Sequence, residues 1–187
     1  MRSEQRQRIH ARSPYARVPL SIELRPYVVT DAQDVWIAAH ESFNELNPWM
    51  PWCHVNYAIE ESRTWIDEQV KAFDARTAFE FAITNDDQYV GGIGLNLIDK
   101  PNRRANLGYW VRTSAAGRGI ATEAVKQIFS WALDNTDLYR FELVIAAGNL
   151  ASQRVAEKAG ATREGILRGR LILHDVAHDA VMFSLTR

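Results

Sequence analysis

The chain has 187 residues, of which 47% are hydrophobic and 24% are charged, and its formal net charge is −1. This composition predicts one globular domain, and no apolar run reaches the roughly 20 residues of a membrane-spanning helix. The single cysteine, Cys53, excludes an internal disulfide and, with no apolar segment after the first arginines, favours a cytoplasmic protein without membrane contact.

Positive charge gathers at the start of the chain. Five arginines and one glutamate precede Pro19, a local charge of about +4, so the remainder carries about −5. We therefore predict a basic arm over residues 1–20 and a single domain over residues 21–187. A nucleic-acid-binding protein carries its basic residues on the fold itself, so no direct contact with nucleic acid is expected.

The first third of the chain predicts a strand, two helices and a stiff loop. Residues 21–29 predict the strand, and Thr30–Asp31 predicts the cap of the helix that follows. Residues 47–52 contain two prolines and therefore end this helix. The tryptophans of this loop, Trp49 and Trp52, predict a substrate-binding wall, and a loop packed on its own core is an equal alternative.

A second amphipathic helix is predicted over residues 59–76, followed by an antiparallel meander. The meander strands are predicted at residues 79–84, 89–98 and 104–112, with turns at Asn85–Asp87 and Asp99–Asn102. The glycine-rich segment Gly91–Gly94 lies inside a strand. It therefore indicates a bulge or a close approach of two backbones and not a nucleotide-binding loop.

A short loop of small residues joins the third meander strand to a helix. Ala121, Val125 and Ile128 recur on one face at helical spacing, directly after the loop. The first N–H groups of a helix have no internal partner, so this loop can bind a phosphate. The dinucleotide-binding pattern would need a third glycine where Thr122 stands. The residues expected at the phosphate are Gly117, Arg118, Gly119, Ile120, Ala121 and Thr122.

The last third predicts a strand at residues 140–147, a helix at 150–159 that stops at Gly160, and strands at 165–173 and 178–185. The element order predicts an α/β (α+β) fold. One mostly antiparallel sheet should carry helices on both faces.

Two motifs in this order resemble the GNAT superfamily of N-acyltransferases. Ala116, Gly119 and Ala121 occupy three positions of its pyrophosphate loop, although Ala116 replaces the usual Arg or Gln. The segment Asn149–Ala161 resembles the second conserved block of that superfamily. Further motifs, at residues 79–98, 107–111 and 178–185, resemble the RimJ/RimL-like branch, which includes ribosomal-protein alanine and serine N-terminal acetyltransferases. The resemblance begins near Ile22 and excludes the basic arm.

This resemblance implies the GNAT fold and direct acetyl transfer from acetyl-CoA to an amine. Coenzyme A would enter between the strands at 104–112 and 140–147. The loop would bind its pyrophosphate, backbone groups of Trp110 and Val111 would pair with the pantetheine, and Asn149 would contact a pantetheine amide. No metal or further cofactor is implied.

The residues that would donate and accept protons depart from the usual pattern of the superfamily. Many GNAT enzymes have a tyrosine where this chain has Ala156, and the branch resemblance makes Ser152 the acid; alternatively, Ser152 caps its helix and positions coenzyme A. Asn106 stands where relatives often carry a glutamate base. Glu80, Glu41 or a chain of water molecules could replace it, although a glutamate at such a position is more often a structural or solvated carboxylate than a base. A weak base would favour an α-amine, with a pKa near ~8, over a lysine near ~10.4.

The expected acceptor is a protein N-terminus, of the ribosomal-protein type, and the acidic body should attract a basic peptide. A small amine, such as an antibiotic or a polyamine, is the alternative acceptor. A non-catalytic module that binds coenzyme A is a third hypothesis, because Ala116, Asn106 and Ala156 each replace a usual functional residue. A homodimer is left open. Asn44 stands where a His-Glu-x-x-His zinc site needs its second histidine, so no metal site is expected.

Overall fold

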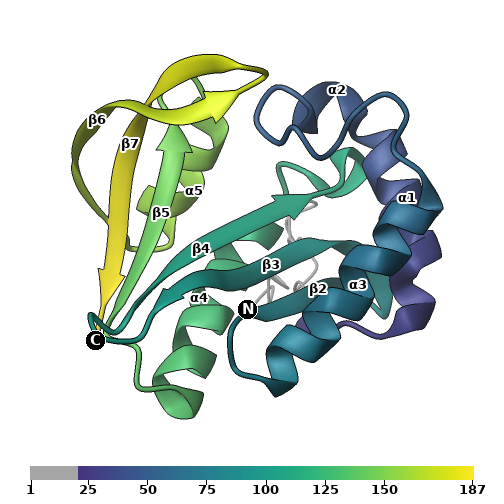
Figure 1. The fold of residues 1–187 in the computed structure, drawn as a ribbon, viewed down its shortest axis with the longest axis horizontal. Helices are drawn as coiled ribbons and strands as arrows, with labels where there is room; N and C mark the ends of the chain where they lie inside the picture. The colour runs from purple at the N-terminus through teal and green to yellow at the C-terminus, as the bar shows by residue number, and fades with distance from the viewer. Residues whose placement is uncertain (1–20) are drawn as a thin grey trace, which may run out of the picture.

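The computed structural model describes residues 21–187 and contains one seven-stranded sheet with helices on both faces (Figure 1). The strand order is β1-β2-β3-β4-β5-β7-β6, and all neighbours are antiparallel except β4 and β5. The strands are β1 (Ile22–Pro26), β2 (Phe79–Asn85), β3 (Gln88–Asp99), β4 (Arg104–Val111), β5 (Arg140–Ala146), β6 (Thr162–Leu173) and β7 (Val176–Thr186). The predicted fold class is confirmed, and the basic arm lies outside the described residues.

Helices cover both faces of the sheet. They are α1 (Ala32–Glu41), α2 (Phe43–Leu46), α3 (Ile59–Asp74), α4 (Ile120–Asn135) and α5 (Leu150–Lys158). Buried residues of α4, such as Val125 and Ile128, pack with Phe141 and Phe183 of the sheet. On the opposite face, α1 and α3 bury Val35 and Ile66 against β2 and β3. Within residues 21–187, no helix combines the length and the apolar character needed to cross a bilayer.

Asp31 occupies the N-cap position of α1, as predicted, but its side chain does not cap that helix. The Asp31 carboxylate accepts two hydrogen bonds from Arg25, at 2.8 and 2.7 Å, and one from the N–H of Val28 at 2.9 Å. These bonds close the turn between β1 and α1, so the carboxylate makes no capping bond to the first turn of the helix. The short helix α2 and the early start of β6 at Thr162 were also not predicted.

Glycines in β3 allow neighbouring backbones and side chains to come close, as the sequence indicated. A Cβ atom on Gly91 would lie 2.2 Å from the carbonyl oxygen of Trp110 on β4. A Cβ atom on Gly92 would lie 2.4 Å from the Tyr27 hydroxyl. Both positions therefore exclude any side chain.

Strands β4 and β5 pair only at their first residues and then separate. Their register joins Arg104 to Arg140, Ala105 to Phe141, and Asn106 to Glu142. Beyond Asn106, β4 stays paired with β3 while β5 stays paired with β7, so the two strands diverge as a V (Figure 1). The sheet is therefore open along one side of Leu107–Val111, between the strands that the resemblance singled out.

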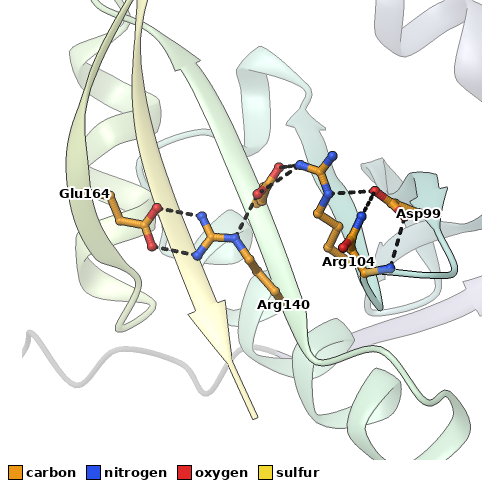
Figure 2. Close-up of polar contacts among 6 residues, drawn as sticks. Asp99, Arg104, Arg140 and Glu164 are labelled. Atoms are coloured by element: carbon orange, nitrogen blue, oxygen red, sulfur yellow. Dashed lines mark hydrogen bonds and ion pairs between the residues drawn. The ribbon is translucent and has the colours of Figure 1, made fainter.

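A network of charges ties the closed end of this V (Figure 2). Arg104 and Arg140 face each other across β4 and β5, and Glu142 accepts hydrogen bonds from both, at 3.3 and 2.8 Å. Arg104 also binds Asp99 at 3.0 Å, and Arg140 binds Glu164 through two bonds of 2.7 and 2.6 Å. Without the shared carboxylate, two directly opposed arginines would repel. The network thus joins β3, β4, β5 and β6 where the parallel pairing is short.

Candidate active site

The V opens onto a groove of about 390 Å³. Among its lining residues are nine that the sequence predicted to bind coenzyme A: Trp110, Val111, Gly117, Gly119, Ile120, Ala121, Thr122, Asn149 and Ser152. Trp49, predicted to bind the substrate, lines the same groove. Arg118 is not among the lining residues, and its side chain is exposed. Its expected contribution is the backbone N–H, which does not depend on where the side chain lies.

The loop before α4 has the geometry of an anion-binding turn. Gly117 and Gly119 adopt left-handed φ angles of +73° and +91°, and Gly119 is the N-cap of α4. Within residues 21–187, no group accepts a hydrogen bond from the N–H of Gly117, Arg118 or Gly119. A Cβ atom on Gly117 would meet nothing within 4 Å. The loop is therefore not filled by its own side chains, and its amides are free to bind a phosphate.

Two basic residues of α5 extend this anion site. Arg154 and Lys158 are four positions apart on one helix face, and both line the groove. Sequence reasoning missed them. The signal was available, because their spacing places both charges on the same side of a helix that follows the groove strand.

A second cavity, of about 680 Å³, shares the middle of β4 with the groove. Met50, Tyr109 and Trp110 line both spaces. An acetyl donor in the groove and an amine in the cavity would therefore meet beside these residues. The other aromatic residues of the cavity are Tyr27, Trp52, Tyr57 and Trp65, and its carboxylates are Glu60, Glu61, Glu68 and Glu80.

The two tryptophans of the proline-rich loop fall into different spaces. Trp52 lines the cavity and packs edge-on against Tyr57 and Trp110, with ring centroids 5.5 and 5.6 Å apart. Trp49 lines the groove and reaches to within 3.3 Å of the Cβ position of Gly148. The structure thus separates the two tryptophans that the sequence assigned to one substrate-binding wall: Trp52 lines the cavity, whereas Trp49 lines the groove.

Glu80 presents a carboxyl group to the cavity from β2. A Cβ atom on Gly94, its partner on β3, would lie 1.8 Å from Glu80 Oε2, so this glycine makes room for the carboxyl group. Asn96 Nδ2 donates to Glu80 Oε1 at 3.0 Å, and Asn106 Nδ2 donates to Asn96 Oδ1 at 2.9 Å. Burial raises the pKa of Glu80 to about 7, against the opposing effect of the Asn96 bond. Near neutral pH this carboxyl group can accept a proton.

The carboxylate of Glu41, the other candidate base, is already engaged in hydrogen bonds at the end of β4. It accepts hydrogen bonds from Arg112 and from the N–H of Ser114, the latter at 2.7 Å. The Arg112 bond is the main reason that the pKa of Glu41 falls to about 2. A carboxylate that is ionised and paired in this way is a poor proton acceptor, and its contacts instead fix the end of β4 against α1.

Ser152 lies in the first turn of α5, and its hydroxyl group is hydrogen-bonded to the hydroxyl group of Tyr109. The two hydroxyl oxygens are 2.8 Å apart, and Asn149 Oδ1 accepts the Ser152 N–H at 3.0 Å. Asn149 is therefore the residue that caps the helix, which leaves the Ser152 hydroxyl free of that role. Burial raises the pKa of Tyr109 to about 12, so Tyr109 keeps its proton at neutral pH. Sequence reasoning did not assign a role to Tyr109.

Comparison with known proteins agrees with this geometry. A family model described as an acetyltransferase (GNAT) domain matches residues 21–162. The chain belongs to the GNAT acetyltransferase family. The Bacillus subtilis protein named "Probable N-acetyltransferase YjcK" is 31% identical over 165 residues, which is 85% of this chain and 90% of YjcK. This GNAT protein is therefore an acyltransferase with acetyl-CoA as its co-substrate.

Two further relatives of this GNAT enzyme carry ribosomal names. The Bacillus subtilis protein named "Putative ribosomal N-acetyltransferase YdaF" is 33% identical over 108 residues, and the alignment covers 58% of this chain and 59% of YdaF. The structure of RimL, a ribosomal L7/L12 alpha-N-protein acetyltransferase in complex with coenzyme A, aligns with a TM-score of 0.83 and 22% identity. It covers 88% of this chain and 93% of RimL. At this identity the RimL likeness establishes the fold.

Neutralising the two basic residues of α5 is expected to weaken the binding of acetyl-CoA. The double variant Arg154→Gln/Lys158→Gln should raise the KM for acetyl-CoA about tenfold, because it removes two charge-assisted contacts to phosphate groups. Steady-state kinetics at varied acetyl-CoA measure this effect. Lys126→Gln, on an exposed position of α4 away from the groove, is the matched control. An unchanged KM in the double variant would show that these side chains do not reach the donor.

Proposed function

We propose that this GNAT enzyme transfers the acetyl group from acetyl-CoA to the α-amine of a protein N-terminus. The observation that carries the proposal is the Glu80 carboxyl group, whose pKa is near 7 and which opens on a cavity that shares Tyr109 and Trp110 with the donor groove. An α-ammonium group with a pKa near ~8 loses its proton to such a base at a cost of about 1.4 kcal/mol. For a lysine near ~10.4 the same transfer costs about 4.6 kcal/mol.

The proposed reaction uses the carboxyl group of Glu80 and the hydroxyl group of Ser152. Glu80 accepts the proton of the ammonium, and the free amine attacks the thioester carbonyl. A backbone N–H of β4, on the side left open by β5, stabilises the oxyanion, a contact worth about 3 kcal/mol in comparable sites. As the C–S bond breaks, the attached nitrogen loses its second proton to water. The Ser152 hydroxyl, hydrogen-bonded to Tyr109, gives its proton to the thiolate and regains one from solvent.

The ribosomal names of YdaF and RimL support an N-terminal acceptor. A small amine is the second candidate, and the cavity favours it on size, because about 680 Å³ lies within the range of small-molecule sites. Cytoplasmic location and a homodimer stay predictions.

Acceptor identity is tested by thiol release from acetyl-CoA with short peptides and with small amines. We expect acceptor-dependent release with peptides that have a free N-terminus, and mass spectrometry should place the acetyl group on the α-nitrogen. Peptides blocked at the N-terminus, with a free lysine inside, are the control and should remain unmodified. Release with small amines alone would assign the second candidate, and binding without any release would favour the non-catalytic hypothesis.

A further inference from the structure

The cavity of about 680 Å³, in which we propose that the acceptor binds, is lined by acidic side chains. Of the described residues that line it, four are glutamates and none is Lys or Arg. Glu80 lies on β2, whereas Glu60, Glu61 and Glu68 come from α3, which crosses the first strands of the sheet (Figure 1). The cavity therefore offers one carboxyl group for the reacting amine and a separate row of carboxylates along its rim.

Two of the rim carboxylates, Glu60 and Glu68, are less fully paired than the third. Glu61 is occupied, since its oxygens accept from the N–H of Ala58 at 2.8 Å and bind His54 at 3.1 Å. Glu60 meets Arg63 only at 3.7 Å, and its side chain is 71% exposed. Within residues 21–187, Glu68 has no ion-pair partner. The unsatisfied charge of the rim thus lies at Glu60 and Glu68.

The aromatic walls of the cavity add to this preference for a cation. Trp52, Tyr57 and Trp65 line the same space as the rim carboxylates. The face of an aromatic ring attracts an ammonium or guanidinium group, most strongly for tryptophan. A cationic side chain bound in this cavity would therefore have both aromatic rings and carboxylates within reach.

We infer that the acceptor peptide carries a Lys or Arg within its first three residues and that this second positive charge is attracted by the carboxylates of Glu60 and Glu68, which lie toward the two ends of the rim. These two residues are eight positions apart on α3, about 12 Å along the helix. An extended peptide rises about 3.3 Å per residue, so three residues and a long side chain cover this rim. The inference rests on the proposed N-terminal acceptor and adds its specificity.

The test compares three six-residue peptides that begin with serine and differ only at positions 2 and 3, where both residues are Lys, Gln or Glu. We expect kcat/KM to be about tenfold higher for the Lys peptide than for the Gln peptide at low salt, or about 1.4 kcal/mol. The Glu peptide should be the poorest acceptor. Raising the ionic strength from about 0.02 M to about 0.5 M should reduce the preference, because these carboxylates are exposed.

The double variant Glu60→Gln/Glu68→Gln should reduce the Lys-to-Gln ratio to below about threefold. Asp67→Asn is the matched control: Asp67 is exposed on the same helix, does not line the cavity, and its replacement changes the charge in the same direction. This variant should keep the wild-type ratio.

Two results would overturn the inference while leaving the proposed function intact. One is equal kcat/KM for all three peptides with wild-type enzyme, and the other is an unchanged ratio in the double variant. By contrast, turnover of putrescine with no acetylation of any peptide would remove the N-terminal acceptor itself. The two failures are thus distinguishable in one set of assays.

Discussion

Replacing Glu80 with glutamine is expected to lower kcat/KM for a peptide acceptor by about 10²- to 10³-fold. Glutamine keeps the size of the side chain and can still pair with Asn96, but it cannot accept the ammonium proton. The wild-type kcat/KM should rise with pH through the Glu80 pKa near 7, below the pH at which the acceptor amine loses its proton in solution. In Glu80→Gln the rise should instead follow the pKa of the acceptor amine, and pH profiles of the two enzymes measure this difference.

The raised pKa of Glu80 should also make the folded protein less stable as pH rises, whereas kcat/KM increases over the same range. The pKa of Glu80 is about 7 in the folded protein and near 4.5 when unfolded, so the folded state binds more protons between these values. The free energy of unfolding therefore falls as pH rises from about 4.5 to 7, by at most about 3 kcal/mol. At pH 8, Glu80→Gln should melt at the wild-type temperature or above it.

Asn96→Ala provides a second, graded test of Glu80. The Asn96 hydrogen bond lowers the pKa of Glu80 against the effect of burial, so its loss should move the rise in kcat/KM to higher pH. A full-rate Glu80→Gln enzyme, or an Asn96→Ala enzyme with the wild-type profile, would show that another group accepts the proton.

Removing either hydroxyl of the Tyr109–Ser152 pair is expected to lower kcat about 10²-fold and leave acetyl-CoA affinity within about twofold. Ser152→Ala removes the proposed donor to the thiolate. Tyr109→Phe keeps the ring but removes the oxygen 2.8 Å from Ser152 Oγ, so the serine proton loses its partner. Single-turnover rates and calorimetric titration with acetyl-CoA separate the two effects.

The double variant decides whether the two hydroxyls act together. If they form one unit, Tyr109→Phe/Ser152→Ala should be no slower than the slower single variant. Multiplied losses would mean independent roles. Equal losses of turnover and acetyl-CoA affinity in Ser152→Ala would reassign this serine to binding.

Local sequence was sufficient for the parts of the site that a single segment builds. The turn at Gly117 and Gly119 and the helix after it depend on residues next to one another, so spacing alone predicted them. The groove between β4 and β5 was expected only from the resemblance to the GNAT superfamily. Helix α2, with four residues, is too short to show a period. The first residues of β6 are polar, and the residues of β7 that pair with them, Phe183 and Ser184, are distant in sequence.

The proton-transfer groups were harder to predict, because each depends on a partner brought near by folding. Tyr109 and Ser152 are 43 positions apart, and no local pattern joins them. Glu80 was one of several candidate carboxylates, and its distinction comes from Gly94 and Asn96 on the adjacent strand. Glu41 was an equal candidate by sequence, and only its pairing with Arg112 removes it.

The divergence of β4 from β5 has a consequence for solubility. Amides and carbonyls of an unpaired strand side attract other chains, and exposed examples promote aggregation. Here the unpaired length after Asn106 faces a recess between α4, α5 and the two strands, and not the perimeter of the sheet. A whole β-strand of another protein would have to enter that recess to pair with it. A thin, flexible ligand with a few amide groups fits there instead. The protein can therefore keep unpaired backbone N–H and C=O groups on β4 without exposing them to strands of other protein molecules.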